Sequence, residues 1–207
     1  MVKVEFLGYS CFKIRGVDGS VIIDPYREKA TGLDWNPRKA DVVMVTKEEP
    51  TRDNVDGVKD LRYKISSPGE YEVQTISVVG IGINNTGELL TTAYQCTVDE
   101  LRFLHLGGLD DVLDDSVLSV LTEIDVLFVP VGGGAVLDFE KAAKVVAQIE
   151  PKIVVPMHYQ QGTEQLSNLA SVDKFIEEMG EEKEQREVLK LKSRSALPED
   201  TEVIVLG

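Results

Sequence analysis

Polar residues follow the apolar, strand-like runs of this chain at the points where those strands are expected to end. The segments concerned are Thr46-Lys47-Glu48-Glu49, His105-Leu106-Gly107-Gly108, Pro130-Val131-Gly132-Gly133-Gly134 and Pro156-Met157-His158-Tyr159. The carboxyl ends of buried strands gather at one edge of a layered α/β fold, which predicts a shared pocket. Glu49 and His158 are candidates there for acid–base chemistry. Lys47, Arg52 and His158 are candidates for holding an anion, because their donors favour phosphate or carboxylate.

The elements that must position these residues change character along the chain. Short apolar or alternating runs separated by turn residues predict strands in the first half. They cover residues 2–7, 11–15, 21–24, 41–46, 62–66, 71–80, 91–97 and 101–105. The second half predicts helices over 112–124, from an Asp138 cap to 150 and from a Ser171 cap to 179, and strands over 125–131, 152–155, 188–191 and 202–206. This order predicts one layered α/β domain with mixed sheets over residues 1–207.

Composition limits the possible partners. The chain has 207 residues and a formal net charge of −14, so general binding to nucleic acid is not expected. No apolar run approaches the roughly 20 residues that a membrane helix needs. Cys11 and Cys96 lie in strand-like segments, which predicts free, buried thiols and a cytoplasmic protein. The polar run 181–187 predicts a solvated connection.

Several segments also carry a family resemblance. They are Gly8-Tyr9-Ser10-Cys11-Phe12, Ile22-Ile23-Asp24-Pro25-Tyr26, Ala40-Asp41-Val42-Val43-Met44-Val45-Thr46, Pro68-Gly69-Glu70-Tyr71-Glu72-Val73, His105-Leu106-Gly107-Gly108-Leu109, Val129-Pro130-Val131-Gly132-Gly133 and Ile149-Glu150-Pro151-Lys152-Ile153-Val154-Val155-Pro156-Met157-His158-Tyr159. In this order they resemble the metallo-β-lactamase superfamily, in particular the small hydrolase-like branch related to the ascorbate-6-phosphate lactonases. The resemblance implies a four-layer αββα sandwich with two mixed β-sheets and a dinuclear zinc or manganese site on one edge.

The metal ligands that the resemblance implies do not carry over to this sequence. At the ligand positions stand Lys47 for His, Glu49 for His, Thr51 for Asp, Arg52 for His and Gly108 for Asp, and only His158 is retained. A further family histidine falls in segment 82–87, which has none here. Protonated lysine and arginine do not bind metals. The comparison therefore predicts a degenerate metal site and no metal cofactor.

Three functions follow as alternatives. The first is a catalytically inactive homologue, or pseudoenzyme, with a binding or structural role. The second is a hydrolase with an altered mononuclear or metal-free site that uses Glu49 and His158. The third is a module that binds an anion or phosphometabolite through Lys47, Arg52 and His158. A small anionic molecule or a protein is the expected partner, and a homo-oligomer is plausible. His105 and Cys11 are expected to be buried and structural.

Overall fold

The computed structural model describes residues 1–83 and 91–207, and in this part of the chain the strands form two large mixed sheets. The first sheet has the order β15 (Val188–Leu191), β1 (Val2–Gly8), β2 (Cys11–Arg15), β3 (Ser20–Ile23), β5 (Val42–Met44) and β7 (Tyr63–Ile65). Pairing is antiparallel from β15 to β3 and parallel from β3 to β7. Residues 84–87, most of the segment in which the family has a further histidine and this sequence has none, lie outside the described residues.

The second sheet combines a parallel half with an antiparallel half. Its order is β14 (Glu184–Arg186), β16 (Glu202–Leu206), β13 (Ile153–Met157), β12 (Val126–Pro130), β11 (Leu101–His105), β10 (Thr91–Val98), β9 (Ile76–Ile83) and β8 (Gly69–Val73). Strands from β14 to β11 run parallel, and those from β11 to β8 run antiparallel. Parallel strands therefore end at a common edge in both sheets.

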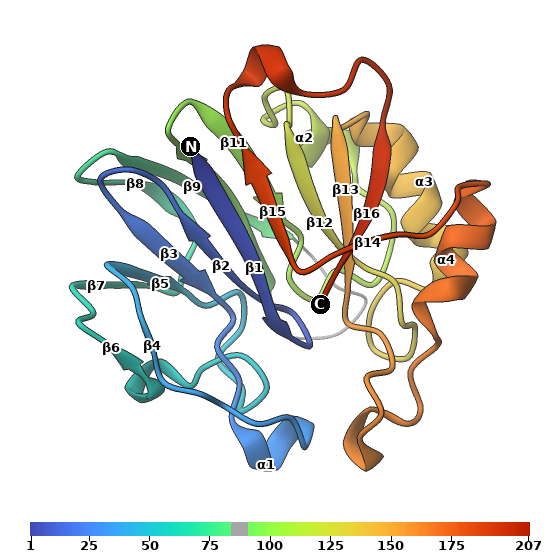
Figure 1. Ribbon diagram of the computed structural model, residues 1–207, viewed down its shortest axis with the longest axis horizontal. Coiled ribbons are helices and arrows are strands. Elements are labelled where there is room, and N and C mark those ends of the chain that lie inside the picture. The colour runs from blue at the N-terminus through green and yellow to red at the C-terminus, as the bar shows by residue number, and fades with distance from the viewer. Residues whose placement is uncertain (84–90) are drawn as a thin grey trace.

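Four layers result from stacking these sheets and covering their outer faces (Figure 1). The helices α2 (Asp115–Leu118), α3 (Phe139–Ile149) and α4 (Val172–Met179) lie on the second sheet. The first sheet is covered by segment 25–61, which contains α1 (Glu28–Thr31), β4 (Arg38–Lys39), η1 (Val55–Gly57) and β6 (Val58–Lys59). Short 3-10 turns η2 (Glu164–Leu166) and η3 (Arg194–Ala196) complete the described elements. The predicted αββα sandwich is confirmed, with a thin helical layer over the first sheet.

The main core fills the space between the two sheets. Phe12 of the first sheet stacks on Phe128 of the second, with ring centroids 4.1 Å apart, and neither ring is exposed. Fully burying one such side chain contributes roughly 1.5–3 kcal/mol. A separate apolar cluster joins the second sheet to α3 and α4. The sheets are thus locked together, which fixes the edge where their strands end.

Some predicted elements differ from the observed ones. The single strand expected over 71–80 is a hairpin of β8 and β9, because Gln74 turns the chain with a φ of 56°. The helix expected over 112–124 is only α2, and its apolar residues pack against the core from irregular backbone. The run 181–187 contains the edge strand β14. The Asp138 and Ser171 caps are confirmed, since each side chain accepts a backbone N–H of its helix.

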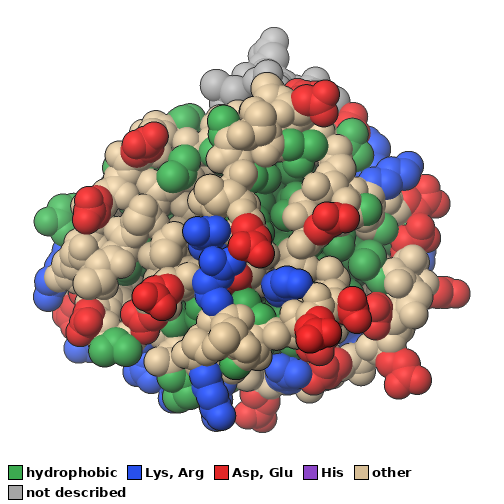
Figure 2. Space-filling view, turned by 90° about the horizontal axis from the view of Figure 1, so that it is seen from above, with side chains coloured by type: hydrophobic (Ala, Val, Ile, Leu, Met, Phe, Trp, Pro, Cys, Tyr) green, Lys and Arg blue, Asp and Glu red, His purple; other side chains and the backbone are tan. Residues whose placement is uncertain are grey.

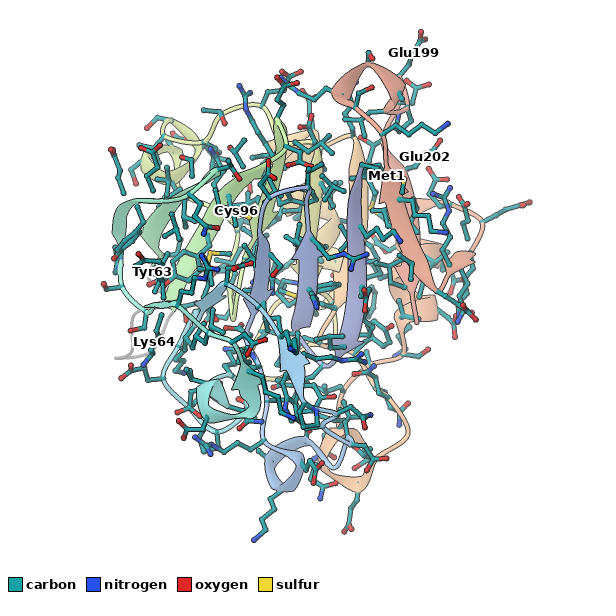
Figure 3. The ribbon with its side chains drawn as sticks, turned by 60° about the vertical axis from the view of Figure 1, so that its left-hand side comes forward. Met1, Tyr63, Lys64, Cys96, Glu199 and Glu202 are labelled. Atoms are coloured by element: carbon teal, nitrogen blue, oxygen red, sulfur yellow. The ribbon has the colours of Figure 1, made fainter. Side chains whose placement is uncertain are left out.

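The two cysteines are free and buried, as predicted. Figure 3 shows Cys96 inside the molecule and Tyr63 with Lys64 at its outer edge. Acidic and basic side chains are interspersed on the face in Figure 2. Among the described helices, none is both long and apolar enough to cross a membrane.

Candidate functional site

The candidate site lies at the edge where parallel strands of both sheets end. Asp24 follows β3, segment 45–52 follows β5, His105 ends β11 and His158 follows β13. Strand polarity brings these ends together. Contacts link the site positions named from the sequence, which are Lys47, Glu49, Thr51, Arg52, Gly108 and His158. The turn between β1 and β2 adds two more residues to this cluster, Tyr9 and Ser10.

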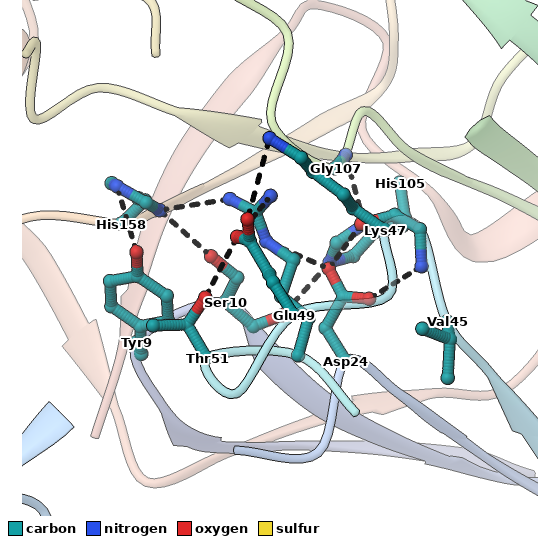
Figure 4. Close-up of polar contacts among 12 residues, drawn as sticks. Tyr9, Ser10, Asp24, Val45, Lys47, Glu49, Thr51, His105, Gly107 and His158 are labelled. Atoms are coloured by element: carbon teal, nitrogen blue, oxygen red, sulfur yellow. Dashed lines mark hydrogen bonds and ion pairs between the residues drawn. The ribbon is translucent and has the colours of Figure 1, made fainter. Parts of the chain in front are cut away.

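The guanidinium of Arg52 contacts the side chains of Asp24, Glu49 and His158, which are labelled in Figure 4. Its Nε lies 3.5 Å from Oδ2 of Asp24, and its Nη1 lies 3.3 Å from Oε1 of Glu49. Its Nη2 lies 3.4 Å from Nδ1 of His158. Only 3% of the Arg52 side chain is exposed. A cation this deeply buried is costly unless it is paired, so the surrounding acceptors offset the cost of burying it.

Asp24 supplies the fully buried carboxylate of the cluster. Its Oδ1 accepts the backbone N–H of Thr46 at 2.7 Å, and its Oδ2 accepts the Thr46 hydroxyl at 2.7 Å. Burial raises the pKa of Asp24 to about 6, while Arg52 and the Thr46 donors oppose this rise. Asp24 is therefore mostly ionised at neutral pH and depends on Arg52 for its counter-charge.

Glu49 lies at the solvent side of Arg52 and is also fully engaged. It accepts the hydroxyl of Thr51 at 2.8 Å, and Nζ of Lys47 lies 3.3 Å from its Oε2. Burial acts to raise the pKa of Glu49, but Arg52, Thr51 and Lys47 together outweigh burial and lower it. A carboxylate held in the ionised form by these partners is a weak proton acceptor.

His158 has partners on both ring nitrogens. Nε2 lies 3.2 Å from the Tyr9 hydroxyl, and Nδ1 lies 3.1 Å from the Ser10 hydroxyl and faces Arg52. Arginine can only donate, so Nδ1 accepts and the proton of the neutral ring sits on Nε2. Burial lowers the pKa of His158 well below its usual value, and Arg52 lowers it further. These contacts hold the neutral ring of His158 in place.

His105 connects the site to the β1–β2 turn through hydrogen bonds of both ring nitrogens. Its Nε2 donates to the Ser10 carbonyl at 2.9 Å, and its Nδ1 accepts the Gly107 N–H at 3.1 Å. Burial lowers the pKa of His105 to about 3, against the effect of the Ser10 hydrogen bond and with a further lowering by Arg52. His105 is thus a neutral, buried structural residue, as expected.

Three residues of this edge have left-handed backbone. Tyr9, Asp24 and His158 have φ angles of 56°, 49° and 54°. Non-glycine residues in this left-handed region each cost on the order of 1–3 kcal/mol. Local contacts hold them there: the His158 N–H donates to the Tyr9 carbonyl at 2.7 Å, and their rings lie 4.2 Å apart. The strain fixes the direction of the Asp24 and His158 side chains toward Arg52.

Tyr9, Ser10 and Asp24 were not assigned to the site from the sequence. Asp24 offered a usable signal, because it directly follows the apolar run Val21-Ile22-Ile23 and so ends a buried strand like the other site segments. Tyr9 and Ser10 offered none, because a turn between antiparallel strands gives no indication of the edge it faces.

Comparisons with known proteins place the chain in a family. Residues 3–158 match the beta-lactamase superfamily domain. The chain therefore belongs to the metallo-β-lactamase superfamily. A metal-dependent hydrolase of Archaeoglobus fulgidus is 23% identical over 195 residues, spanning 76% of this chain and 83% of the relative. Another metal-dependent hydrolase, from Thermococcus kodakarensis, is 26% identical over 201 residues, spanning 77% and 85%.

A solved structure gives the same result. A Thermotoga maritima protein assigned as a zinc-dependent hydrolase of the metallo-β-lactamase superfamily superposes with a TM-score of 0.84. Its sequence is 25% identical, and the match spans 100% of this chain and 98% of that one. The expected resemblance and fold are thus confirmed.

The relatives are named metal-dependent hydrolases, and these names imply a metal cofactor. The prediction of no metal cofactor is therefore wrong. The residues at this edge nevertheless do not fit the family's dinuclear site. Among residues 1–83 and 91–207, no group of three or more His, Cys, Asp and Glu side chains could hold an ion. The guanidinium of Arg52 lies between the carboxylates of Asp24 and Glu49, and both nitrogens of His158 are engaged. The side chains described at this edge therefore do not supply the ligand set that two metal ions need.

Proposed function

We propose that this chain is a catalytically inactive member of the metallo-β-lactamase superfamily with a binding or structural role. The buried guanidinium of Arg52 is the observation that supports this most strongly. It fills the centre of the edge and contacts Asp24, Glu49 and His158, so reacting groups of a substrate have no free acceptor to meet among these three side chains. The degenerate site predicted at positions 47–52 and 108 is part of the same proposal.

The altered-hydrolase alternative has less support. It requires Glu49 or His158 to take or give a proton during turnover. Glu49 is held ionised by Arg52, Thr51 and Lys47, and 4% of His158 is exposed. The lowered pKa of His158 makes its ring a poor base near neutral pH.

The anion-pocket alternative also has less support, because the cations of the site already have anionic partners. Lys47 pairs with Glu49, and Arg52 pairs with both Glu49 and Asp24. An incoming phosphate would have to displace or approach these carboxylates, which costs Coulomb energy. Of the two expected partners, we propose a protein rather than a small anion. The free, buried thiols of Cys11 and Cys96 support a reducing compartment such as the cytoplasm.

Hydrolysis assays test the proposal. The purified protein, supplied with zinc or manganese, is expected to show no turnover of lactones, phosphodiesters or phosphate esters above that of a denatured sample. The variants Glu49→Gln and His158→Ala are expected to give the same background rates. Turnover by the native protein that falls at least about tenfold in either variant would establish the hydrolase alternative and reject the proposal.

A further inference from the structure

Three polar side chains face the three nitrogen atoms of the Arg52 guanidinium group. Asp24 faces Nε at 3.5 Å, Glu49 faces Nη1 at 3.3 Å and His158 faces Nη2 at 3.4 Å. Each nitrogen of the planar group thus faces a different polar side chain, by an ion-pair contact at Nε and Nη1 and a hydrogen bond at Nη2, and these side chains come from the ends of β3 and β13 and from the loop after β5. An ordinary ion pair uses one or two nitrogens, whereas this arrangement recognises the whole group.

Two further features distinguish these surroundings from a surface ion pair. Asp24 is completely buried, and its Oδ2 also accepts the Thr46 hydroxyl, so its position does not depend on Arg52 alone. His158 is held on its other side by the Tyr9 hydroxyl at 3.2 Å. Nε of Arg52 makes no hydrogen bond with any described residue, so its contact with Asp24 is Coulombic. The acceptors are therefore preorganised by the fold and surround a charge.

Gly108 lies against the guanidinium group of Arg52 and leaves no room for a side chain there. A Cβ atom at this position would lie 2.6 Å from Nη1 of Arg52, 3.1 Å from Nη2 and 3.2 Å from Cζ. Real Cβ atoms do not approach other heavy atoms as closely as the first of these distances, so any side chain at position 108 would have to displace the guanidinium. Glycine at 108 and arginine at 52 are thus spatially coupled.

We propose that Asp24, Glu49, His158 and Gly108 form a guanidinium-binding site, which Arg52 fills from within the same chain. Without the Arg52 side chain, the site accepts an external alkylguanidinium ion. The ligand class is a planar monocation with three N–H-bearing nitrogens, because the acceptors are two carboxylates and a neutral imidazole. This binding property is separate from the proposed function and holds whether or not the protein hydrolyses a substrate.

Chemical rescue tests the site directly. Arg52→Ala keeps Cβ, so N-ethylguanidinium supplies the atoms that the substitution removes. Thermal unfolding of Arg52→Ala is expected to shift upward by at least about 2 °C, saturably, with millimolar N-ethylguanidinium, since a ligand that binds only the folded state stabilises it. The native protein, whose site is filled, is expected to show no upward shift. The neutral isostere N-ethylurea is expected to have no effect on either protein.

Matched controls make each outcome decisive. Arg27→Ala removes a half-exposed arginine that pairs with Asp53 at 3.3 Å, and it should show no rescue. Absence of a shift in folded Arg52→Ala, an equal shift in Arg27→Ala, or an equal effect of N-ethylurea would overturn the proposal.

A second comparison covers the case in which Arg52→Ala does not fold. Gly108→Ala is expected to lower the Tm of the native protein, because the added methyl group meets Nη1. In an Arg52→Lys background, which lacks the Nη atoms, the same change should lower the Tm by less than half as much. Equal losses in the two backgrounds would overturn the proposed coupling of positions 52 and 108.

Discussion

Arg52→Ala is expected to lower the free energy of unfolding by about 3–5 kcal/mol, the range for removing one partner of a buried ion pair. The substitution leaves Asp24, which is fully buried, without its counter-charge. It also removes the contact with Nδ1 of His158 and opens the space beside Gly108. Urea unfolding at neutral pH measures the loss.

Arg27→Ala is the matched control for this prediction. Its ion pair with Asp53 has a similar distance, 3.3 Å, but 46% of the Arg27 side chain is exposed. Exposed pairs contribute about 1 kcal/mol or less. A loss in Arg52→Ala within about 0.5 kcal/mol of the loss in Arg27→Ala would show that Arg52 has no special role in stabilising the edge.

Acidification from pH 7 to 4.5 is expected to destabilise the protein, because two buried histidines of the site resist protonation in the native state. Burial lowers the pKa of His105 to about 3 and that of His158 well below its usual value. As the pH falls, both rings therefore take up protons more readily in the unfolded chain than in the native state. His105 alone contributes a loss of about 2.5 kcal/mol by pH 4.5, and His158 contributes in the same direction. Asp24 acts in the opposite direction, because its native pKa of about 6 exceeds the unfolded value. Protonation of Asp24 therefore raises the free energy of unfolding by about 2 kcal/mol as the pH falls to 4.5, which offsets part of the loss from the histidines.

His105→Gln separates these contributions. Glutamine can donate to the Ser10 carbonyl but does not titrate, so the loss between pH 7 and 4.5 should shrink by about 2.5 kcal/mol. Denaturant unfolding of both proteins at the two pH values gives the comparison. A pH dependence that His105→Gln leaves unchanged would mean that His105 is not held neutral.

Much of the edge could be predicted from the sequence because strand polarity is encoded locally. Apolar runs that end in polar residues located the segment 46–52 and His158, and the stacking of the two sheets then brought these strand ends to one edge. The helix over 112–124 was overestimated, because apolar residues at helical spacing can also reach a core from irregular backbone.

The burial of Arg52 was not predictable in the same way. Arginine is almost never fully buried unless it is paired, and a charged loop such as 47–52 ordinarily lies in solvent. Its burial depends on Asp24, which is distant in sequence, and on the absence of a side chain at Gly108. Neither of these two conditions can be recognised in the sequence around Arg52. The burial of its guanidinium is therefore seen only in the three-dimensional structure.

The guanidinium of Arg52 stabilises this edge through its ion pair with Asp24. A double-mutant cycle with Arg52→Ala and Asp24→Asn measures it directly, from the free energies of unfolding of the native protein, the two single variants and the double variant. Residues that interact in one network couple by about 0.5–3 kcal/mol, and the burial of both side chains predicts a favourable coupling of at least about 1.5 kcal/mol. Additive losses, with a coupling of less than about 0.5 kcal/mol, would contradict the account.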